Sequence, residues 1–321
     1  MKLLKTLLVA AACASCVSAQ SAPREAYHLV PGSVVPNRGP DGNSVFLDAP
    51  DGLILVDTGR HPEHRDRLLA YARERGRPIA AIVNTHWHLD HTTGNAELRA
   101  AFPEAQVYAS RAIERALTGF LARSRASTQA ALDAGRVPEA NRAEVARAFA
   151  AMDNPAALRP TRPVTASGEM RAAGRRLRVN LARFAVTEGD VWLYDPAIRV
   201  AIVGDLVVAI VPFMDTACAE GWRRALGEIA ATPFTTLIPG HGAPMTRADF
   251  IAWRAAFDAF VDCGQSERPR ADCVAGWRRD AARFIPTDSE ALIDNLAGYY
   301  VDSRLRAAPE ERGRYCEGGP G

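Results

Sequence analysis

The stretch Thr85-His86-Trp87-His88-Leu89-Asp90-His91 places three imidazoles and one carboxylate within six positions. It follows Ile79-Ala80-Ala81-Ile82-Val83-Asn84, a short apolar run rich in β-branched residues that predicts a buried strand. The cluster is therefore expected on a loop at the C-terminal end of that strand. Imidazole nitrogens and carboxylate oxygens are the ligands that borderline divalent cations, zinc above all, prefer. One such histidine would be interpreted as a polar loop residue, but four ligand-type side chains together predict a metal site.

The spacing inside the cluster indicates how its side chains would divide between two metal ions. His86 and His88 alternate, so an extended backbone would point both rings the same way, toward one ion. Asp90 and His91 lie about one turn further on and can face a second ion.

The N-terminal residues 1–19 have the order of a signal peptide. Lys2 and Lys5 precede a run of leucine, valine and alanine, and Val17-Ser18-Ala19 offers a small-residue cleavage site before Gln20. We expect a mature chain of residues 20–321, periplasmic or secreted, without a stable membrane span. A buried N-terminal helix or a lipid anchor at Cys13 or Cys16 is the less favoured alternative.

The charge balance argues against a nucleic-acid partner. Both lysines of the chain lie in the signal segment, so the mature chain carries 37 arginines against 37 Asp plus Glu residues. Binding to phosphate backbones requires a concentrated basic stripe, and none is present. A small-molecule substrate is the expected partner, and the sequence leaves the oligomeric state open.

Four cysteines follow the signal segment, namely Cys218, Cys263, Cys273 and Cys316. An even number in an oxidising compartment predicts two disulfide bonds, and three pairings are possible. Cys263 with Cys273 would close a short loop, and Cys218 with Cys316 would tie down the C-terminus. A cysteine zinc site is disfavoured because no close C-x-x-C spacing occurs.

The order of elements predicts one domain, because no Gly/Ser-rich linker or repeat divides residues 20–321. Short apolar runs separated by turns over 26–56 predict an antiparallel sheet, and helix 61–75 then leads to the strand before the cluster. Residues 110–152 form an Ala- and Arg-rich helical stretch, either an insert that covers the site or, preferably, a solvated helical pair. A second set follows, with strands at 169–173, 177–182, 191–194, 200–203 and 235–238, a helix at 222–231 and a helical C-terminal extension over about 250–321. Two similar halves packed face to face are expected.

Several motifs in a fixed order carry a resemblance to the metallo-β-lactamase superfamily. They are Val56-Asp57-Thr58-Gly59, the His86 to His91 cluster, Thr187-Glu188-Gly189-Asp190 with Val191-Trp192-Leu193-Tyr194, Val203-Gly204-Asp205, and Ile238-Pro239-Gly240-His241-Gly242. The resemblance covers most of the mature chain. It implies an α/β fold, the four-layer αββα sandwich, with one or two zinc ions at the strand ends.

Carried over by position, the resemblance assigns His86 and His88 to a first metal site. It assigns Asp90, His91 and His241 to a second site, with Asp205 bridging the two. Asp57 is expected behind the ligands, where such a partner orients a ligand ring.

One position departs from the family pattern. The family usually has a third first-site histidine just before the Thr-x-Gly-Asp segment, and this chain has Val186 there. Glu188, His61 or His64 could replace it, although each is more often a polar loop residue. Without a replacement, we expect one firmly bound Zn²⁺ at Asp90, His91, Asp205 and His241, and a second ion at His86 and His88 that is weak or absent.

The resemblance implies a metallohydrolase in which a metal-activated hydroxide, oriented by Asp90, attacks an ester, lactone, thioester, amide or phosphoester bond. A catalytically weak or silent metal-binding or accessory protein is the alternative, and β-lactam hydrolysis is a minor one. Against the last, the mature chain lacks a lysine to hold a substrate carboxylate, although an arginine could do so. Iron or manganese can occupy similar sites.

Overall fold

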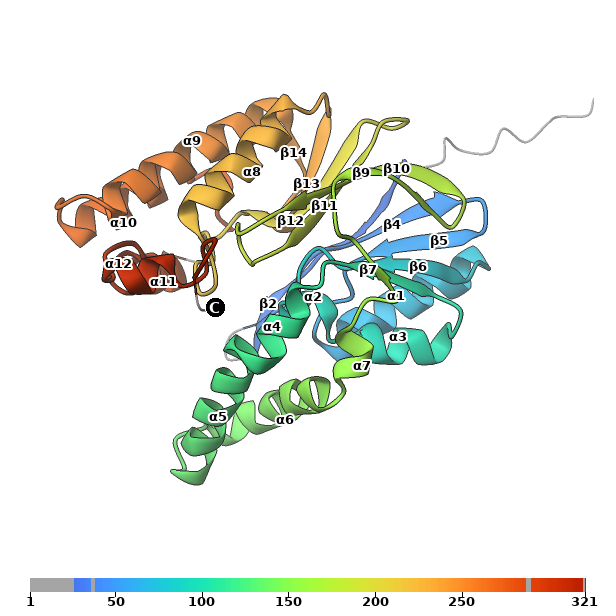
Figure 1. The fold of residues 1–321 in the computed structure, drawn as a ribbon, viewed down its shortest axis with the longest axis horizontal. Helices are drawn as coiled ribbons and strands as arrows, with labels where there is room; N and C mark the ends of the chain where they lie inside the picture. The colour runs from blue at the N-terminus through green and yellow to red at the C-terminus, as the bar shows by residue number, and fades with distance from the viewer. Residues whose placement is uncertain (1–25, 36–37, 287–289, 320) are drawn as a thin grey trace, which may run out of the picture.

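The computed structural model describes residues 26–35, 38–286, 290–319 and 321. The predicted signal peptide at 1–19, with Cys13 and Cys16, lies outside these residues. Two six-stranded sheets pack face to face, and helices cover the outer face of each sheet (Figure 1). The expected αββα sandwich is therefore confirmed.

The first sheet has the strand order β1-β4-β5-β6-β7-β8. β1 and β4 are antiparallel to their neighbours, whereas β5, β6, β7 and β8 run parallel. Its strands are β1 (His28–Val30), β4 (Ser44–Ala49), β5 (Gly52–Val56), β6 (Ile79–Val83), β7 (Gln106–Ala109) and β8 (Arg162–Pro163), and the helices that follow β5 and β6 are α1 (Pro62–Arg75), α2 (Leu89–Thr92) and α3 (Asn95–Ala101). α1 starts with a proline and ends at Gly76, whose φ of 60° fits a left-handed helix cap.

The second sheet has the order β14-β13-β12-β11-β10-β9, in which only β12 and β13 are parallel. Its strands are β9 (Gly168–Ala172), β10 (Arg175–Ala182), β11 (Asp190–Asp195), β12 (Val200–Val208), β13 (Thr236–His241) and β14 (Met245–Thr246). Its helices are α8 (Ala219–Ala231), α9 (Arg247–Gly264), α10 (Arg270–Asp280), α11 (Glu290–Tyr300), the π-helix η1 (Val301–Leu305) and α12 (Pro309–Gly313). α8 and α9 cover the outer face of this sheet, and the helices that follow them pack on α9 and on one another to one side of it (Figure 1).

Two smaller groups of elements complete the described chain. A hairpin of β2 (Val34–Val35) and β3 (Gly39–Pro40) stands apart from both sheets. Between β7 and β8 lie α4 (Ala112–Thr118), α5 (Phe120–Asp133), α6 (Glu139–Asp153) and α7 (Pro155–Leu158). α5 and α6 project from the body of the molecule, and most of their side chains are exposed (Figure 1). The start of α5 packs on Trp87 of the histidine cluster, and Glu144 of α6 is buried, so the preference for a solvated helical pair stays a prediction.

The core lies in three layers. Between the sheets, Val45, Leu47 and Ile54 of the first sheet pack against Leu193 and Ile202 of the second. Each such buried aliphatic side chain contributes roughly 1.5–3 kcal/mol to folding. The other two layers join the first sheet to α1 and α3, and the second sheet to α8, α9, α10 and α11.

Two disulfide bonds fix the C-terminal helices. Cys218 pairs with Cys316 and Cys263 pairs with Cys273, which is one of the three pairings that the sequence allows. The first bond joins the segment before α8 to the end of the chain. In the described residues, no helix has the length and apolar character needed to span a membrane.

Candidate metal centre

The predicted ligands lie where parallel strands of both sheets end. Asp57 follows β5, and His86 and His88 occupy the bend after β6, the neighbouring parallel strand. Asp205 lies in β12 and His241 ends β13, the parallel pair of the second sheet. Since the carboxyl ends of parallel strands share one edge, segments far apart in the sequence meet there.

Two groups of ligand atoms form at this edge, and Asp205 belongs to both. In one group, an atom each from Asp90, His91, Asp205 and His241 lies within 4.8 Å of the others. In the second group, the same holds for His86, His88 and Asp205. The structure thus brings together all six residues that the sequence assigned as ligands.

The four-residue group is rich in carboxylates. His241 Nε2 lies 3.1 Å from an Asp90 oxygen and 3.4 Å from an Asp205 oxygen, and His91 Nε2 lies 3.1 Å from that same Asp205 atom. Burial lowers the pKa of His241, but the Asp205 and Asp90 carboxylates outweigh it and raise the pKa to about 9. For His91, too, Asp205, Asp57 and Asp90 outweigh burial, and its pKa lies well above the usual value. The group therefore strongly favours positive charge.

Asp57 and Thr85 orient two of the imidazoles. Asp57 Oδ2 lies 2.8 Å from His91 Nδ1 and also accepts the Thr85 hydroxyl at 2.7 Å. Because that hydroxyl donates to Asp57, its oxygen accepts from His86 Nδ1 at 3.0 Å. The remaining ring nitrogens, Nε2 of His86 and His91, face Asp205 at 3.7 Å and 3.1 Å and would be the ligand atoms toward a bound ion. Asp57 has a φ of 58°, a left-handed conformation that these contacts hold in place.

Thr216 orients the third imidazole. Its hydroxyl donates to the Val186 carbonyl at 2.9 Å, so its oxygen accepts from His88 Nε2, also at 2.9 Å. His88 therefore holds its proton on Nε2 and presents Nδ1 as its lone-pair nitrogen. Thr216 is fully buried, and the backbone around Val186 thus supports His88 although its side chain offers no ligand atom.

None of the three candidates for replacing Val186 belongs to either ligand group. His61 lies between Asp41, at 2.7 Å from Nδ1, and Glu144, at 3.1 Å from Nε2. His64 contacts the Ser44 hydroxyl, and burial lowers its pKa to about 4. Both histidines are buried and take part in polar contacts of their own, outside the two ligand groups.

Close backbone approaches leave the centre little spare room. A Cβ atom on Gly240 would lie 2.0 Å from Asp205 Oδ1, and one on Gly204 would lie 2.5 Å from the Thr85 hydroxyl. Gly204 also has a φ of 53°, which glycine adopts without strain.

Three tryptophans hold the segment that follows Asp205. The indole N–H groups of Trp222, Trp253 and Trp277 donate to the carbonyls of Leu206, Val208 and Ile210, each at 2.9 Å. Alternate carbonyls of one extended segment are thus bonded by α8, α9 and α10. The helices thereby fix the course of the chain from Asp205 toward Thr216.

The donor set fits a divalent cation. His86 Nε2 and Asp205 Oδ2 are buried and lack a hydrogen-bond partner within the described part of the chain. Buried polar atoms are rarely left in this state, and metal coordination is a common reason for it. Imidazole and carboxylate ligands with their outer atoms already bonded match a zinc-type site.

A model of the metallo-beta-lactamase superfamily matches residues 38–241, which is more than half of the chain and includes all six ligand candidates. The chain belongs to the metallo-beta-lactamase superfamily. Among solved members, a family protein from Thermus thermophilus has a TM-score of 0.58 at 20% identity, covering 88% of this chain and 96% of that one. A double mutant of the sec-alkyl sulfatase PisA1 also has a TM-score of 0.58, at 18% identity, covering 90% of this chain and 54% of that one. These likenesses show the superfamily fold.

Curated members of the superfamily match only short segments. A linear primary-alkylsulfatase of Pseudomonas sp. is 43% identical over 63 residues, 19% of this chain and 11% of the relative. A hydroxyacylglutathione hydrolase of Thermosynechococcus vestitus is 40% identical over 70 residues, 21% of this chain and 27% of the relative. The chain therefore matches about a quarter or less of these relatives' lengths.

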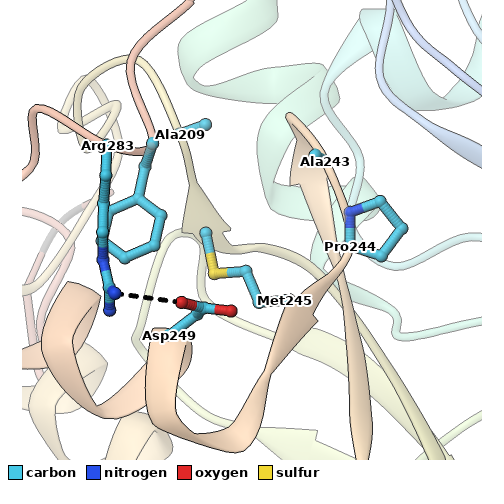
Figure 2. Close-up of a pocket in the computed structure, with 7 residues that line it drawn as sticks. Ala209, Ala243, Pro244, Met245, Asp249 and Arg283 are labelled. Atoms are coloured by element: carbon cyan, nitrogen blue, oxygen red, sulfur yellow. Dashed lines mark ion pairs between the residues drawn. The ribbon is translucent and has the colours of Figure 1, made fainter.

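A cavity of about 180 Å³ lies beyond His241, outside both ligand groups. It is lined by Ala209, Ala243, Pro244, Met245, Asp249, Arg283 and Phe284. Figure 2 shows the ion pair of Arg283 with Asp249, 3.2 Å long, across this cavity. Its one cation is thus already paired with its one carboxylate.

Sequence reasoning missed Thr85 and Thr216 as partners of the ligand rings. Thr85 adjoins the cluster, so its position was a usable signal. Thr216 lies 128 residues from His88 and precedes Cys218 in a segment without a recognisable motif. Only the fold brings its hydroxyl to the ring.

Proposed function

We propose that this chain is a secreted, zinc-dependent hydrolase. The observation that carries the proposal is the pair of ligand groups that share Asp205, in which three imidazoles donate their outer N–H to fixed acceptors. Superfamily membership and the hydrolase names of the relatives support it. The signal segment at 1–19 and the two disulfide bonds support secretion.

Asp90, His91, Asp205 and His241 would hold the firmly bound ion, and His86, His88 and Asp205 would hold a weaker one. A divalent ion held by these residues would lower the pKa of water to about 7 and would stabilise negative charge on a substrate oxygen. Iron or manganese instead of zinc would serve the same donor set.

The chain's own residues prepare this chemistry by fixing ligand geometry. Asp57, Thr85 and Thr216 hold three rings in one tautomer, so no ring has to reorient during the reaction. Asp90 is 6% exposed, and we assign it the catalytic role of orienting the attacking water by accepting its hydrogen bond.

An ester, lactone, thioester or amide bond is the proposed target, because each gains negative charge on one oxygen that the site can stabilise. A sulfate ester is the second candidate. It is favoured by the alkylsulfatase names of two similar proteins, one of which matches 90% of this chain in structure. β-Lactam hydrolysis remains a minor candidate, since residues 20–321 contain no lysine to hold a substrate carboxylate.

A substrate panel on zinc-loaded protein tests the proposal. It contains a nitrophenyl ester, a thioester, a lactone, a nitrophenyl sulfate and a chromogenic cephalosporin, each measured before and after removal of metal with a chelator. We expect chelator-sensitive turnover of at least one substrate. Zinc-replete protein that cleaves none of them would instead support the alternative, a silent metal-binding or accessory protein.

A further inference from the structure

Arg60 follows the Asp57-Thr58-Gly59 turn, and its guanidinium has no counter-ion among the residues that the structure describes. It is partly buried, and its Nε atom is shielded from solvent without a hydrogen-bond partner. Within the described ranges, no hydrogen bond or ion pair joins its guanidinium to another residue. Guanidinium groups removed from water are normally paired with a carboxylate or phosphate. The missing partner therefore requires an explanation.

The backbone of Arg60 is fixed close to the metal centre. Its N–H donates to Asp41 Oδ1 at 2.7 Å, and two residues earlier the Thr58 N–H donates to the His91 carbonyl at 2.8 Å. The neighbouring segment is tied to the same helix, because the Gly42 N–H donates to the Asp90 carbonyl at 2.9 Å. Arg60 thus stands between β3 and the helix that carries Asp90 and His91.

The side chain lies against β3, where a glycine gives it room. A Cβ atom on Gly39 would come within 2.5 Å of Arg60 Nη1. The segment that follows β3 lies directly against the metal centre, because a Cβ atom on Gly42 would come within 2.2 Å of His91 Cε1.

Arg38 directly precedes β3 and is an arginine with a structural role. Its guanidinium donates to Glu63 at 3.3 Å, and its Nε lies 3.8 Å from Glu144. Arg60 has neither kind of partner among the described residues, although Thr58, two residues before it, is hydrogen-bonded to the His91 carbonyl. Its charge is therefore available to a ligand rather than consumed within the fold.

We propose that Arg60 binds an anionic group of the substrate, a carboxylate, sulfate or phosphate, next to the bond that is cleaved. This inference rests on the proposed hydrolase function and narrows it to anionic substrates. A guanidinium presents a planar fork of donors that matches two oxygens of such a group. The group would then anchor one end of the substrate while the metal centre acts on the other.

Two esters that differ only in charge test the proposal. Mono-4-nitrophenyl succinate and 4-nitrophenyl butyrate share a leaving group and acyl length, but only the first carries a carboxylate. They are compared on zinc-loaded wild type, Arg60→Gln, Arg60→Lys and the control Arg38→Gln. We expect Arg60→Gln to lower the succinate-to-butyrate ratio of kcat/KM by about tenfold, mainly through KM, because a charged hydrogen bond is lost.

Arg60→Lys should keep part of the ratio, and Arg38→Gln should keep all of it. Both substrates are measured on one preparation, so partial misfolding cancels from the ratio. An unchanged ratio in Arg60→Gln, or an equal fall in Arg38→Gln, would overturn the proposal. If Arg60→Gln lowered kcat/KM by the same factor for both esters, Arg60 would act on the metal centre in general and not on the anionic group. That result would also overturn the proposal.

A binding measurement separates this proposal from the proposed function. If zinc-loaded wild type cleaves neither ester, the esterase function fails, and calorimetric titration with succinate, inorganic sulfate and inorganic phosphate still tests the anion site. The anion that binds tightest identifies the recognised group. We expect Arg60→Gln to weaken that anion about tenfold. Equal binding by wild type and Arg60→Gln, including no binding by either, would refute the anion site.

Discussion

The two ligand groups share Asp205 but differ in charge. Around His91 and His241, burial lowers the imidazole pKa values, but Asp205 and Asp90, joined by Asp57 at His91, raise both above the ordinary range. In the other group, burial lowers the pKa of His86 and His88, and for His86 the positive charges of His91 and His88 lower it further. One group therefore attracts cations through its own carboxylates, and the other offers mainly neutral nitrogen.

The two ligand groups also differ in the number of ligand side chains. The carboxylate-rich group has four ligand side chains, whereas the histidine group has Val186 near the place where a further ring is expected. Thr216 supports His88 there but contributes no ligand of its own. A shared edge of two sheets thus carries one centre with a full set of donors and one with a reduced set.

Removing a ligand from each group should produce the largest effect. We expect His241→Ala to lose the firmly bound ion and to lower hydrolysis by at least about a thousandfold, since the metal contributes several kcal/mol to transition-state stabilisation. His86→Ala should leave one ion bound and lose less activity. Zinc analysis and turnover of both variants check this, and equal metal loss in the two variants would contradict the difference between the groups.

The two metal sites of the wild-type protein should differ in zinc affinity by at least about a hundredfold. Loss of a hydrogen-bond partner behind a ligand lowers metal affinity roughly 10–100-fold, and a missing ligand should lower it more. Protein dialysed against low zinc should then contain nearer one ion than two per chain. Inductively coupled plasma mass spectrometry gives the stoichiometry, and cobalt titration gives the two affinities. Two ions held equally tightly would sink the idea of an incomplete first site.

An imidazole at position 186 should reduce the difference in zinc affinity between the two sites. We expect Val186→His to strengthen the first site by more than about tenfold if the imidazole reaches it. Val186 is fully buried, so the larger side chain should also lower stability by about 1–3 kcal/mol. Val186→Leu has similar bulk without a nitrogen and serves as the control. Unchanged first-site affinity in Val186→His, at normal folding, would show that position 186 does not limit this site.

The sequence predicted those parts of the fold and site that depend on local patterns. The apolar run before His86 and the Asp57 turn each mark the end of a parallel strand, so the positions of their ligands followed from strand polarity. The pairing of Cys218 with Cys316 was one of three possibilities, because no local pattern selects it.

Contacts across the chain could not be predicted in this way. Trp222, Trp253 and Trp277 fit ordinary apolar helix positions, and nothing near them in sequence indicates that they donate to β12 and the residues beyond it. The sequence also could not predict that Arg60 has no ion-pair partner in the described part of the chain, since many acidic residues could have paired with it. Both features depend on which segments the two sheets bring together.

The smallest effect is expected at Thr216, which acts on the histidine group through one hydrogen bond. Thr216→Val keeps the shape but leaves His88 Nε2 and the Val186 carbonyl without a partner, so we expect first-site affinity to fall about tenfold. Thr216→Ser keeps the hydroxyl and loses a buried methyl group. Both variants should lose about 1 kcal/mol or more of stability, but only Thr216→Val should change cobalt binding at the first site. Equal cobalt affinities in the two variants would show that packing, and not the hydrogen bond, positions His88.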